Sequence, residues 1–332
     1  MSNTQLARPP YDPELVGAVG PFPSAVTDAA SFQAFRESPA LGLAELEPLF
    51  RQHRLEYSEV VAPGPRGDVI LGVLRPAGTA GEALPVLYDI HGGGMVFGDR
   101  FTSFMPEVLE WSAEFRMVIV SPEYGLAPEV PAPGGALDCF AGLKWVAEHA
   151  DELGIDASRI IVGGASGGGG LAASVGLLAR DHSGPSLLAQ MLLCPQLEDR
   201  HQTVSSRQFS AETGAIDPWP RETNAFAWEQ LLGAGHAERE VDIYSSPARA
   251  TDLSGLAQTY IDCGGNEVFR DADVAYASLL WESGVSTELH VWPGGFHGFD
   301  MLSPAAPVSH DARAARVKWL RRVLDAAAPA AG

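Results

Sequence analysis

The feature that most constrains this fold is an alternation of short apolar segments with helical patterns, which begins near residue 56. The strand-like segments are at 55–61, 68–74, 84–90, 117–121, 159–164, 187–194, 257–263 and 287–292. Several are continuously apolar, which is typical of strands that helices cover on both faces. The first two follow each other closely and favour an antiparallel pair. We therefore predict an α/β fold with a mostly parallel, doubly wound sheet of about eight strands.

Two segments interrupt this alternation and predict a second, smaller part of the molecule. Residues 1–50 are rich in proline, and residues 200–245 form a long irregular insertion. An insertion of that length in a compact domain is usually functional. We interpret 51–199 and 246–328 as the main α/β domain. Residues 1–50 and 200–245 would then form a helical cap over the carboxyl ends of the strands, where ligands bind in open α/β sheets.

Composition and charge exclude several classes of partner and site. The chain has 332 residues, of which 46% are hydrophobic, and a formal net charge of −20. That charge repels nucleic acid and anionic membrane surfaces, so neither is an expected partner. No apolar run approaches the ~18 residues of a membrane span, and the N-terminus lacks the apolar region of a signal peptide, so we expect a cytoplasmic protein. Three cysteines without a CxxC pair favour buried thiols over disulfides or a metal site.

The segment GASGG at 164–168 directly follows the strand-like run RIIVGG and precedes an apolar helical pattern. Glycines on both sides of a serine allow a strained strand-to-helix turn, which exposes the serine hydroxyl at the tip of a sheet. A GxSxG motif also arises by chance in a chain with 36 glycines, so its placement between strand and helix carries the assignment. We predict that Ser166 is a nucleophile.

The same glycine-rich run has a rival interpretation as a phosphate-binding loop. It lacks the glycine-lysine-serine/threonine ending of a P-loop. Gly167, Gly169 and Ala172 fit a degenerate dinucleotide fingerprint, but no acidic residue lies near position 192 to bind a ribose. Nucleotide binding is therefore a poor fit, and no cofactor is predicted.

A second glycine-rich segment, HGGGM at 91–95, follows the strand-like run at 84–90. Glycines leave backbone N–H groups unshielded, so that they can point at an oxyanion. We predict that the amides of Gly92 and Gly93, together with that of Gly167, form an oxyanion hole. His91 is expected to be a structural hydrogen-bonding residue, because this fold places the base late in the chain.

Of nine histidines, only His297 stands in a glycine-rich loop, GGFHGF, after the last strand-like run. We predict that it is the general base. The acid that orients it is expected in the loop after 257–263, where Glu267 occupies the middle. Asp271 is interpreted as a helix cap, and Asp262, inside the strand, would need an unusual reach. The chain order of serine, acid and histidine is that of the α/β-hydrolase fold.

Five ordered segments carry a family resemblance: HGGGM, EYGLAPE at 123–129, GASGG, the Glu267 loop and GGFHGF. From about residue 55 onward, the chain resembles the hormone-sensitive-lipase-like bacterial carboxylesterases. The resemblance implies ester hydrolysis without metal or cofactor, a catalytic domain beneath a cap, and frequent dimerisation. The positions that match the family's nucleophile, base, acid and oxyanion donors are Ser166, His297, Glu267, and Gly92, Gly93 and Gly167.

The chain departs from the family pattern at three further positions. Ala165 stands where many members have aspartate, Gly167 where alanine is usual, and Gly125 where arginine is usual. The first two departures leave the backbone donors in place, although an extra glycine loosens the turn. The acid, Glu267, is aspartate in many relatives. We expect these departures to affect the substrate class and the rate, and to leave the activity itself in place.

The predicted reaction is hydrolysis of carboxylic esters through an acyl-enzyme. An amidase, a deacetylase or an acyltransferase would use the same triad, and a non-catalytic receptor on this fold would be expected to lack the histidine. We expect a small ester substrate with an acyl chain of roughly two to eight carbons, because each methylene adds binding energy only until the pocket ends. The side chains expected to line that pocket are Met95, Phe97, Phe209 and Trp219.

Overall fold

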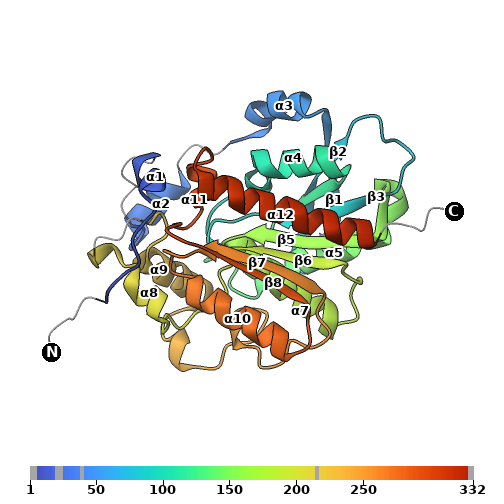
Figure 1. Cartoon of the computed structure of the whole chain (residues 1–332). Helices are drawn as coiled ribbons and strands as arrows, with labels where there is room; N and C mark the ends of the chain where they lie inside the picture. Colours follow the sequence, from blue (N-terminus) through green and yellow to red (C-terminus); the bar gives the residue numbers. More distant parts are fainter. Residues whose placement is uncertain (1–5, 19–24, 38–40, 214–216, 328–332) are drawn as a thin grey trace.

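A single eight-stranded sheet runs through the computed structural model, which describes residues 6–18, 25–37, 41–213 and 217–327 (Figure 1). Its strands are β1 (Leu55–Gly64), β2 (Gly67–Pro76), β3 (Leu84–Ile90), β4 (Val118–Pro122), β5 (Ile155–Ala165), β6 (Ala189–Leu193), β7 (Gln258–Gly264) and β8 (Thr287–Trp292). Each predicted strand-like segment overlaps one of them, so the predicted α/β class is confirmed. Parts of the predicted cap (1–5, 19–24, 38–40 and 214–216) and residue 328 lie outside the described residues.

The strands lie in the order β1-β2-β4-β3-β5-β6-β7-β8. β1 pairs antiparallel with β2, and β2 pairs antiparallel with β4. The other neighbouring strands are parallel. The mostly parallel sheet with an antiparallel opening is therefore confirmed. The carboxyl ends of the parallel strands lie together. The loops that follow β3, β5, β6, β7 and β8 therefore come together there, which is where ligands bind in sheets of this kind.

Helices cover both faces of the sheet (Figure 1). α3, α4 and α12 lie on one face, and α5, α7 and α10 lie on the other. The helix bounds are α1 (Pro13–Ala18), α2 (Ala29–Arg36), α3 (Leu43–Gln52), α4 (Pro106–Phe115), α5 (Gly134–Glu148), α6 (Ala150–Leu153), α7 (Gly167–Asp181), α8 (Val204–Gln208), α9 (Arg221–Leu232), α10 (Arg270–Glu282), α11 (Phe299–Leu302) and α12 (Pro307–Ala326). None of the described helices combines the length and the apolar character that crossing a membrane requires.

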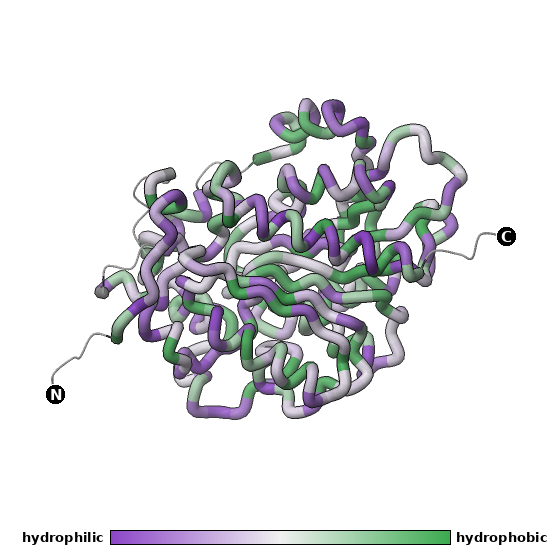
Figure 2. The backbone as a smooth tube through the Cα atoms, in the orientation of Figure 1, coloured by the Kyte–Doolittle hydropathy of each residue, from purple (hydrophilic) through white to green (hydrophobic). Residues whose placement is uncertain are grey.

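Side chains of the strands alternate between the two sides of the core. In β3, Val86, Tyr88 and Ile90 belong to the cluster on the α5 and α7 side, whereas Leu87 packs in the cluster that contains Trp111 of α4. This period of two follows from the pleat of a strand. Figure 2 shows the result as apolar central strands beneath helices with a more polar outer side. Both faces of the central strands are therefore buried, which explains the continuously apolar segments in the sequence.

The two segments predicted to form a cap meet at one end of the sheet. The Phe32 ring of α2 lies 5.4 Å from the Phe226 ring of α9, and the Val26 amide donates to Thr223 Oγ1 at 3.0 Å. By contrast, α3 packs against β1 through Phe50, on the face that also carries α4 and α12. We therefore propose that the cap consists of α1, α2 and residues 200–245, and that α3 belongs with the main domain.

Candidate active site

Ser166 stands at the sharp turn between β5 and α7. Its backbone has φ 58° and ψ −123°, a sparsely populated conformation that surrounding structure must hold in place. Gly164 and Gly168 make the turn sterically feasible, because a Cβ added to Gly164 would lie 2.5 Å from the Ile90 carbonyl oxygen, and one on Gly168 would collide with the same atom. The Ser166 amide donates to the Leu193 carbonyl at 2.8 Å, which ties the turn to β6.

The structure brings the three predicted side chains into one hydrogen-bonded line. Ser166 Oγ lies 2.9 Å from His297 Nε2, and His297 Nδ1 lies 2.5 Å from Glu267 Oε2. The other carboxylate oxygen of Glu267 accepts from the Gly264 amide at 2.5 Å. Glu267 is fully buried, whereas Ser166 and His297 each keep 9% exposure. A buried, doubly hydrogen-bonded carboxylate is well placed to fix the orientation of an imidazole.

The loops that carry the acid and the base are joined to each other by their backbones. The Gly265 amide donates to the Trp292 carbonyl at 2.7 Å, and the Asn266 amide donates to the Gly295 carbonyl at 2.8 Å. The Phe269 ring meets the His297 ring edge-on at 5.1 Å. Glu267 and His297 are therefore held by contacts that the parallel pairing of β7 and β8 makes available.

The two other acids considered for the role of base-orienter lie elsewhere. Asp262 binds Arg316 of α12, with Oδ2 2.8 Å from Nε. Asp271 was expected to cap a helix, and this expectation is wrong for α10, whose N-cap residue Phe269 makes no side-chain cap bond. Asp271 Oδ2 instead accepts from the Ser205 amide of α8 at 2.7 Å. It joins the insertion to the main domain.

The glycine-rich loop after β3 lies against the nucleophile turn. A Cβ added to Gly92 would be 3.6 Å from Ser166 Cβ, and one added to Gly167 would be 2.7 Å from the Met95 amide nitrogen. The amides of Gly92, Gly93 and Gly94 donate to no acceptor within the part of the chain that the structure describes. They are therefore free to receive a negatively charged oxygen.

His91, the first residue of that loop, has a structural environment. Its ring stacks on Tyr124 at 4.1 Å, and the Tyr124 hydroxyl donates to the His91 carbonyl at 2.9 Å. Burial lowers the pKa of His91 below its usual value. A neutral, stacked ring of this kind supports the backbone of the loop instead of exchanging protons with a substrate.

Comparison with known proteins shows which family the chain belongs to. Residues 87–301 match a protein family described as having the alpha/beta hydrolase fold. The chain belongs to the hormone-sensitive-lipase-like α/β hydrolases. Carboxylesterase NlhH of Mycobacterium tuberculosis is 32% identical over 327 residues, which cover 98% of this chain and 100% of that protein. Esterase LipI of the same species is 30% identical over 98% of both chains.

Solved structures that resemble this α/β hydrolase include esterases. A bacterial heroin esterase superposes with a TM-score of 0.83 and 37% identity, covering 95% of this chain and 98% of that one. Esterase LipW of Mycobacterium marinum superposes with a TM-score of 0.79 and 31% identity, covering 96% and 98% of the two chains. The protein is accordingly an enzyme of the carboxylic ester hydrolase class.

The side chains predicted to line this hydrolase's acyl pocket separate into two groups. Met95, Phe97 and Trp219 gather around the glycine-rich loop: the Trp219 ring presses on Gly94, and its centroid is 6.4 Å from that of Phe97. Phe209 instead packs edge-on against Tyr11 at 6.4 Å and lies below the Arg270 guanidinium. Met95, Phe97 and Trp219 remain candidates for substrate contact, whereas Phe209 packs between the N-terminal segment and the insertion.

One neighbour of the triad was missed in the sequence. Cys194, directly after β6, has its sulfur within 4.8 Å of ligand atoms of Glu267 and His297. These three side chains are a set that could hold a metal ion. Burial raises the pKa of the Cys194 thiol well above its usual range, and a thiol binds metal as thiolate. The only sequence signal was its position at the end of a strand beside β5.

A buried cluster of charges beneath the acid and base loops was also missed. Arg316 of α12 contacts Asp262 of β7, Asp300 Oδ2 at 2.5 Å and Glu107 Oε2 at 2.9 Å. Asp262 lies in the strand that precedes the Glu267 loop, and Asp300 lies in α11, directly after the His297 loop, so one guanidinium ties both regions to α12. Burial raises the pKa of Glu107 to about 7. Nothing in the local sequence around these residues indicates the contact.

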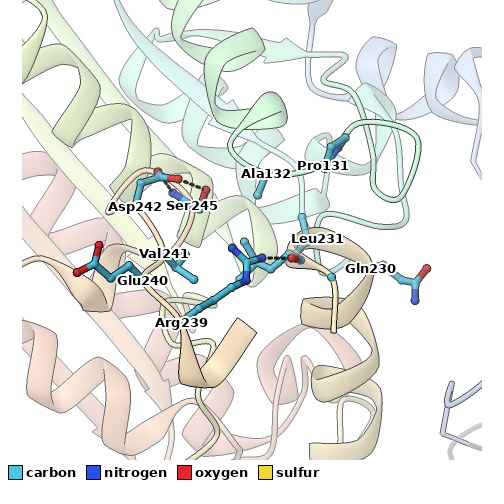
Figure 3. A pocket seen from close by; sticks show the side chains of 11 residues that line it. Pro131, Ala132, Gln230, Leu231, Arg239, Glu240, Val241, Asp242 and Ser245 are labelled. Atoms are coloured by element: carbon cyan, nitrogen blue, oxygen red, sulfur yellow. Dashed lines mark hydrogen bonds between the residues drawn. The ribbon is translucent and has the colours of Figure 1, made fainter. Parts of the chain in front are cut away.

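A cavity of about 380 Å³ lies apart from this site (Figure 3). It is bordered by Pro131, Ala132, the end of α9 and residues 239–242 and 245, and no triad residue lines it. Arg239 donates to the Leu232 carbonyl there, and Asp242 accepts from the Ser245 amide and hydroxyl. The Arg239, Asp242 and Ser245 side chains are thus hydrogen-bonded within the chain, and the cavity shares no residue with Ser166, His297 or Glu267.

Proposed function

We propose that the chain is a serine carboxylesterase that works through an acyl-enzyme with a Ser166–His297–Glu267 triad. The observation that carries the proposal is the continuous line from Ser166 Oγ to His297 Nε2 at 2.9 Å, and from His297 Nδ1 to Glu267 Oε2 at 2.5 Å. The esterases and carboxylesterases among its relatives support the same reaction.

In the proposed first half-reaction, His297 Nε2 removes the proton from Ser166 Oγ as the oxygen attacks the ester carbonyl carbon. Glu267 accepts the Nδ1–H bond, fixes the tautomer and stabilises the imidazolium. The tetrahedral intermediate collapses when His297 protonates the leaving alkoxide, and the acyl group stays on Ser166. A water molecule then repeats the steps and releases the acid.

We further propose that the amides of Gly92, Gly93 and Gly167 stabilise the oxyanion. Support comes from the free amides of the loop and from the position of Gly167 at the start of α7, where backbone N–H groups have no partner within the helix. Loss of one such donor typically costs 10²–10³-fold in kcat, so this contribution is large. It requires no side chain, so alanine at residue 165 is compatible with it.

The proposed substrates are small esters with short to medium acyl chains. Ser166 and His297 are each only 9% exposed, so the site beneath the cap is narrow. Added methylenes contribute ~0.8 kcal/mol each until the space ends. We expect kcat/KM to rise with acyl length within a range of roughly two to eight carbons and to fall beyond the end of the pocket, with negligible hydrolysis of emulsified long-chain triglyceride.

The deciding experiment measures kcat/KM on p-nitrophenyl acetate, butyrate, octanoate and palmitate beside a triolein emulsion, with wild type and Ser166→Ala. Organophosphate should label Ser166 alone, and Ser166→Ala should lose ~10⁴–10⁶-fold in kcat. Labelling of another serine would overturn the triad, and a maximum at palmitate would overturn the proposed chain length. Faster turnover of matched p-nitroanilides than of esters would favour an amidase.

A further inference from the structure

Gln196, on the loop after β6, is a buried side chain with unused hydrogen-bonding groups. It has 0% exposure, and neither its amide oxygen nor its amide nitrogen has a hydrogen-bond partner among the described residues. Buried polar groups are nearly always paired, and a group that is not needs a reason. An apolar side chain of the same size would avoid the cost of this unpaired amide.

The Gln196 backbone is tied to the nucleophile turn. Its backbone N–H donates to the Ser166 carbonyl at 2.9 Å. Its Oε1 would lie 3.5 Å from a Cβ added to Gly94, the same point on which the tip of the Trp219 ring presses. The Gln196 amide therefore lies between the nucleophile turn, the glycine-rich loop and the aromatic side chain of the cap.

A second unpaired polar group approaches from the cap. Asp217 is 5% exposed, and its Oδ1 accepts from the Trp219 amide at 2.9 Å, while Oδ2 has no hydrogen-bond partner in the described part of the chain. The Trp219 indole itself is paired, since Nε1 donates to Asn224 Oδ1 at 3.2 Å. Trp219 is thus fixed in place, and the free hydrogen-bonding groups lie with the two residues that adjoin it.

We propose that Gln196, near the tip of the Trp219 ring, and Asp217, bonded to the Trp219 backbone amide, form a polar subsite that binds a neutral hydrogen-bonding group of the ester substrate. The substrate class is then a small ester with a hydroxyl, keto or amide group a few atoms from the carbonyl. This inference rests on the proposed esterase function and deepens it. The Met95 and Trp219 side chains supply the apolar wall, and the subsite selects one position along it.

The charge state of the subsite favours a neutral group over an ammonium group. Burial, and secondarily the nearby Glu267 carboxylate, raise the pKa of Asp217 well above its usual range, which disfavours the ionised form. A glutamine amide both donates and accepts and is always neutral. A hydroxyl or carbonyl group can pair with these two side chains, whereas a cation would need an ionised Asp217.

The test compares esters that differ only in the polar group. For the acyl side, the pairs are p-nitrophenyl pentanoate with 4-oxopentanoate and butyrate with 3-hydroxybutyrate. For the alcohol side, the pair is butyl acetate with 3-oxobutyl acetate, followed by titration of released acid. Each kcat/KM is divided by the rate of alkaline hydrolysis of the same ester. We expect the polar ester to exceed its apolar match by at least about tenfold on one side.

Gln196→Met should lower kcat/KM on the polar ester of each pair more than on its apolar match, and so remove the preference. Asp217→Asn should keep most of the preference, because a neutral amide replaces a neutral carboxyl. The control is Gln190→Met, because Gln190 of β6 is also fully buried with an unpaired Oε1, but its Nε2 donates to Thr259 Oγ1 at 3.0 Å. This control should leave the preference unchanged.

The outcomes separate the inference from the function on which it rests. Hydrolysis of plain esters that depends on Ser166, without a polar preference on either side, would overturn the subsite and leave the esterase intact. Absence of hydrolysis of every ester would overturn the function. A strong preference for p-nitrophenyl 4-(trimethylammonio)butyrate that Asp217→Asn abolishes would show an ionic subsite and overturn the neutral one. Equal losses on both members of each pair in Gln196→Met would assign Gln196 a purely structural role.

Discussion

Arg316, beneath the loops that carry Glu267 and His297, has its guanidinium bound to three carboxylates, whereas Gln196, beside Gly94, has neither polar side-chain atom paired with a described residue. Both side chains are buried, at 4% and 0% exposure. A network of hydrogen-bonded ion pairs fixes the elements that it joins, while an amide with no partner is stable only when something else compensates it. The Arg316 network therefore fixes the positions of the loops that carry Glu267 and His297, and we call it the geometric region. The surroundings of Gln196 are those of the proposed subsite, and we call them the recognition region.

The strongest test of the geometric region is at Glu267, because this residue contacts the proposed general base, His297. Glu267→Gln should lower kcat by ~10⁴-fold, because an amide allows the wrong imidazole tautomer. The fold should persist, since the change preserves volume. Stopped assays on p-nitrophenyl butyrate, with circular dichroism as a check on folding, measure this. Asp271→Asn is the matched control and should leave kcat nearly unchanged; the reverse pattern would exchange the roles of the two acids.

Arg316→Met removes the guanidinium at the centre of the geometric region. It leaves Asp262, Asp300 and Glu107 buried without the guanidinium that contacts them all. Removing one partner of a buried charge pair costs about 3–5 kcal/mol, and a large loss of unfolding free energy should appear in urea titrations. Arg322→Met, which removes an exposed pair with Glu288, should change stability by less than about 1 kcal/mol. Similar effects of the two changes would contradict the anchoring role.

The charged region should also make stability depend on pH. Burial raises the folded-state pKa of Glu107 to about 7, despite the opposing attraction of Arg316. Its proton is lost at lower pH in the unfolded state than in the folded state. Stability should therefore fall as pH rises from the usual glutamate range to about 7, and stay lower above that.

Glu107→Gln removes this titration. The variant should be more stable than wild type at pH 8 by about 1 kcal/mol or more, and the difference should vanish near pH 4. Thermal melts across that range measure it. Burial also raises the pKa of Asp89 to about 7, so part of the slope should survive in the variant. A variant that is less stable than wild type at pH 8 would show that Glu107 is ionised and needed there.

The smallest expected effect is on the recognition region. Gln196→Met should raise the unfolding free energy by about 1 kcal/mol, because it removes buried polar atoms that have no partner in the described structure. Chemical denaturation of the substrate-free protein is the measurement. A loss of stability would instead mean that ordered water pairs the Gln196 side-chain amide. Gln196 would then differ from Arg316 only in having water as its partner, and its unpaired groups would no longer indicate a binding site.

The sequence predicted the parts of this enzyme that local patterns encode. Ser166, His297 and Glu267 could be predicted to lie together because each follows a recognisable strand, and parallel strands bring the loops at their carboxyl ends together. Phe209 could not be placed, since its packing on Tyr11 joins segments far apart in the chain. Arg316 was overlooked for the same reason: in a helical pattern, an arginine that will be buried looks like any surface charge.

The helix-cap interpretation of Asp271 failed for a related reason. An aspartate near the start of a helix predicts a cap, yet its carboxylate found a better-placed amide at Ser205 in the insertion. Tertiary contacts override local propensity where a distant backbone donor lies closer. Gln196 represents the extreme case, because the absence of a partner becomes visible only after all of its described neighbours are placed.

The tight contact at Gly167 has a consequence for how this enzyme can change. A methyl group at that residue would lie 2.7 Å from the Met95 amide nitrogen and 2.8 Å from that of Gly94, and neither backbone atom can rotate aside. Residue 167 and the loop at 92–95 can therefore change only together. A lineage that acquires alanine at 167 must first, or at once, acquire a loop that stands farther back. Libraries built from single substitutions will miss that route, whereas libraries that vary both segments together can follow it.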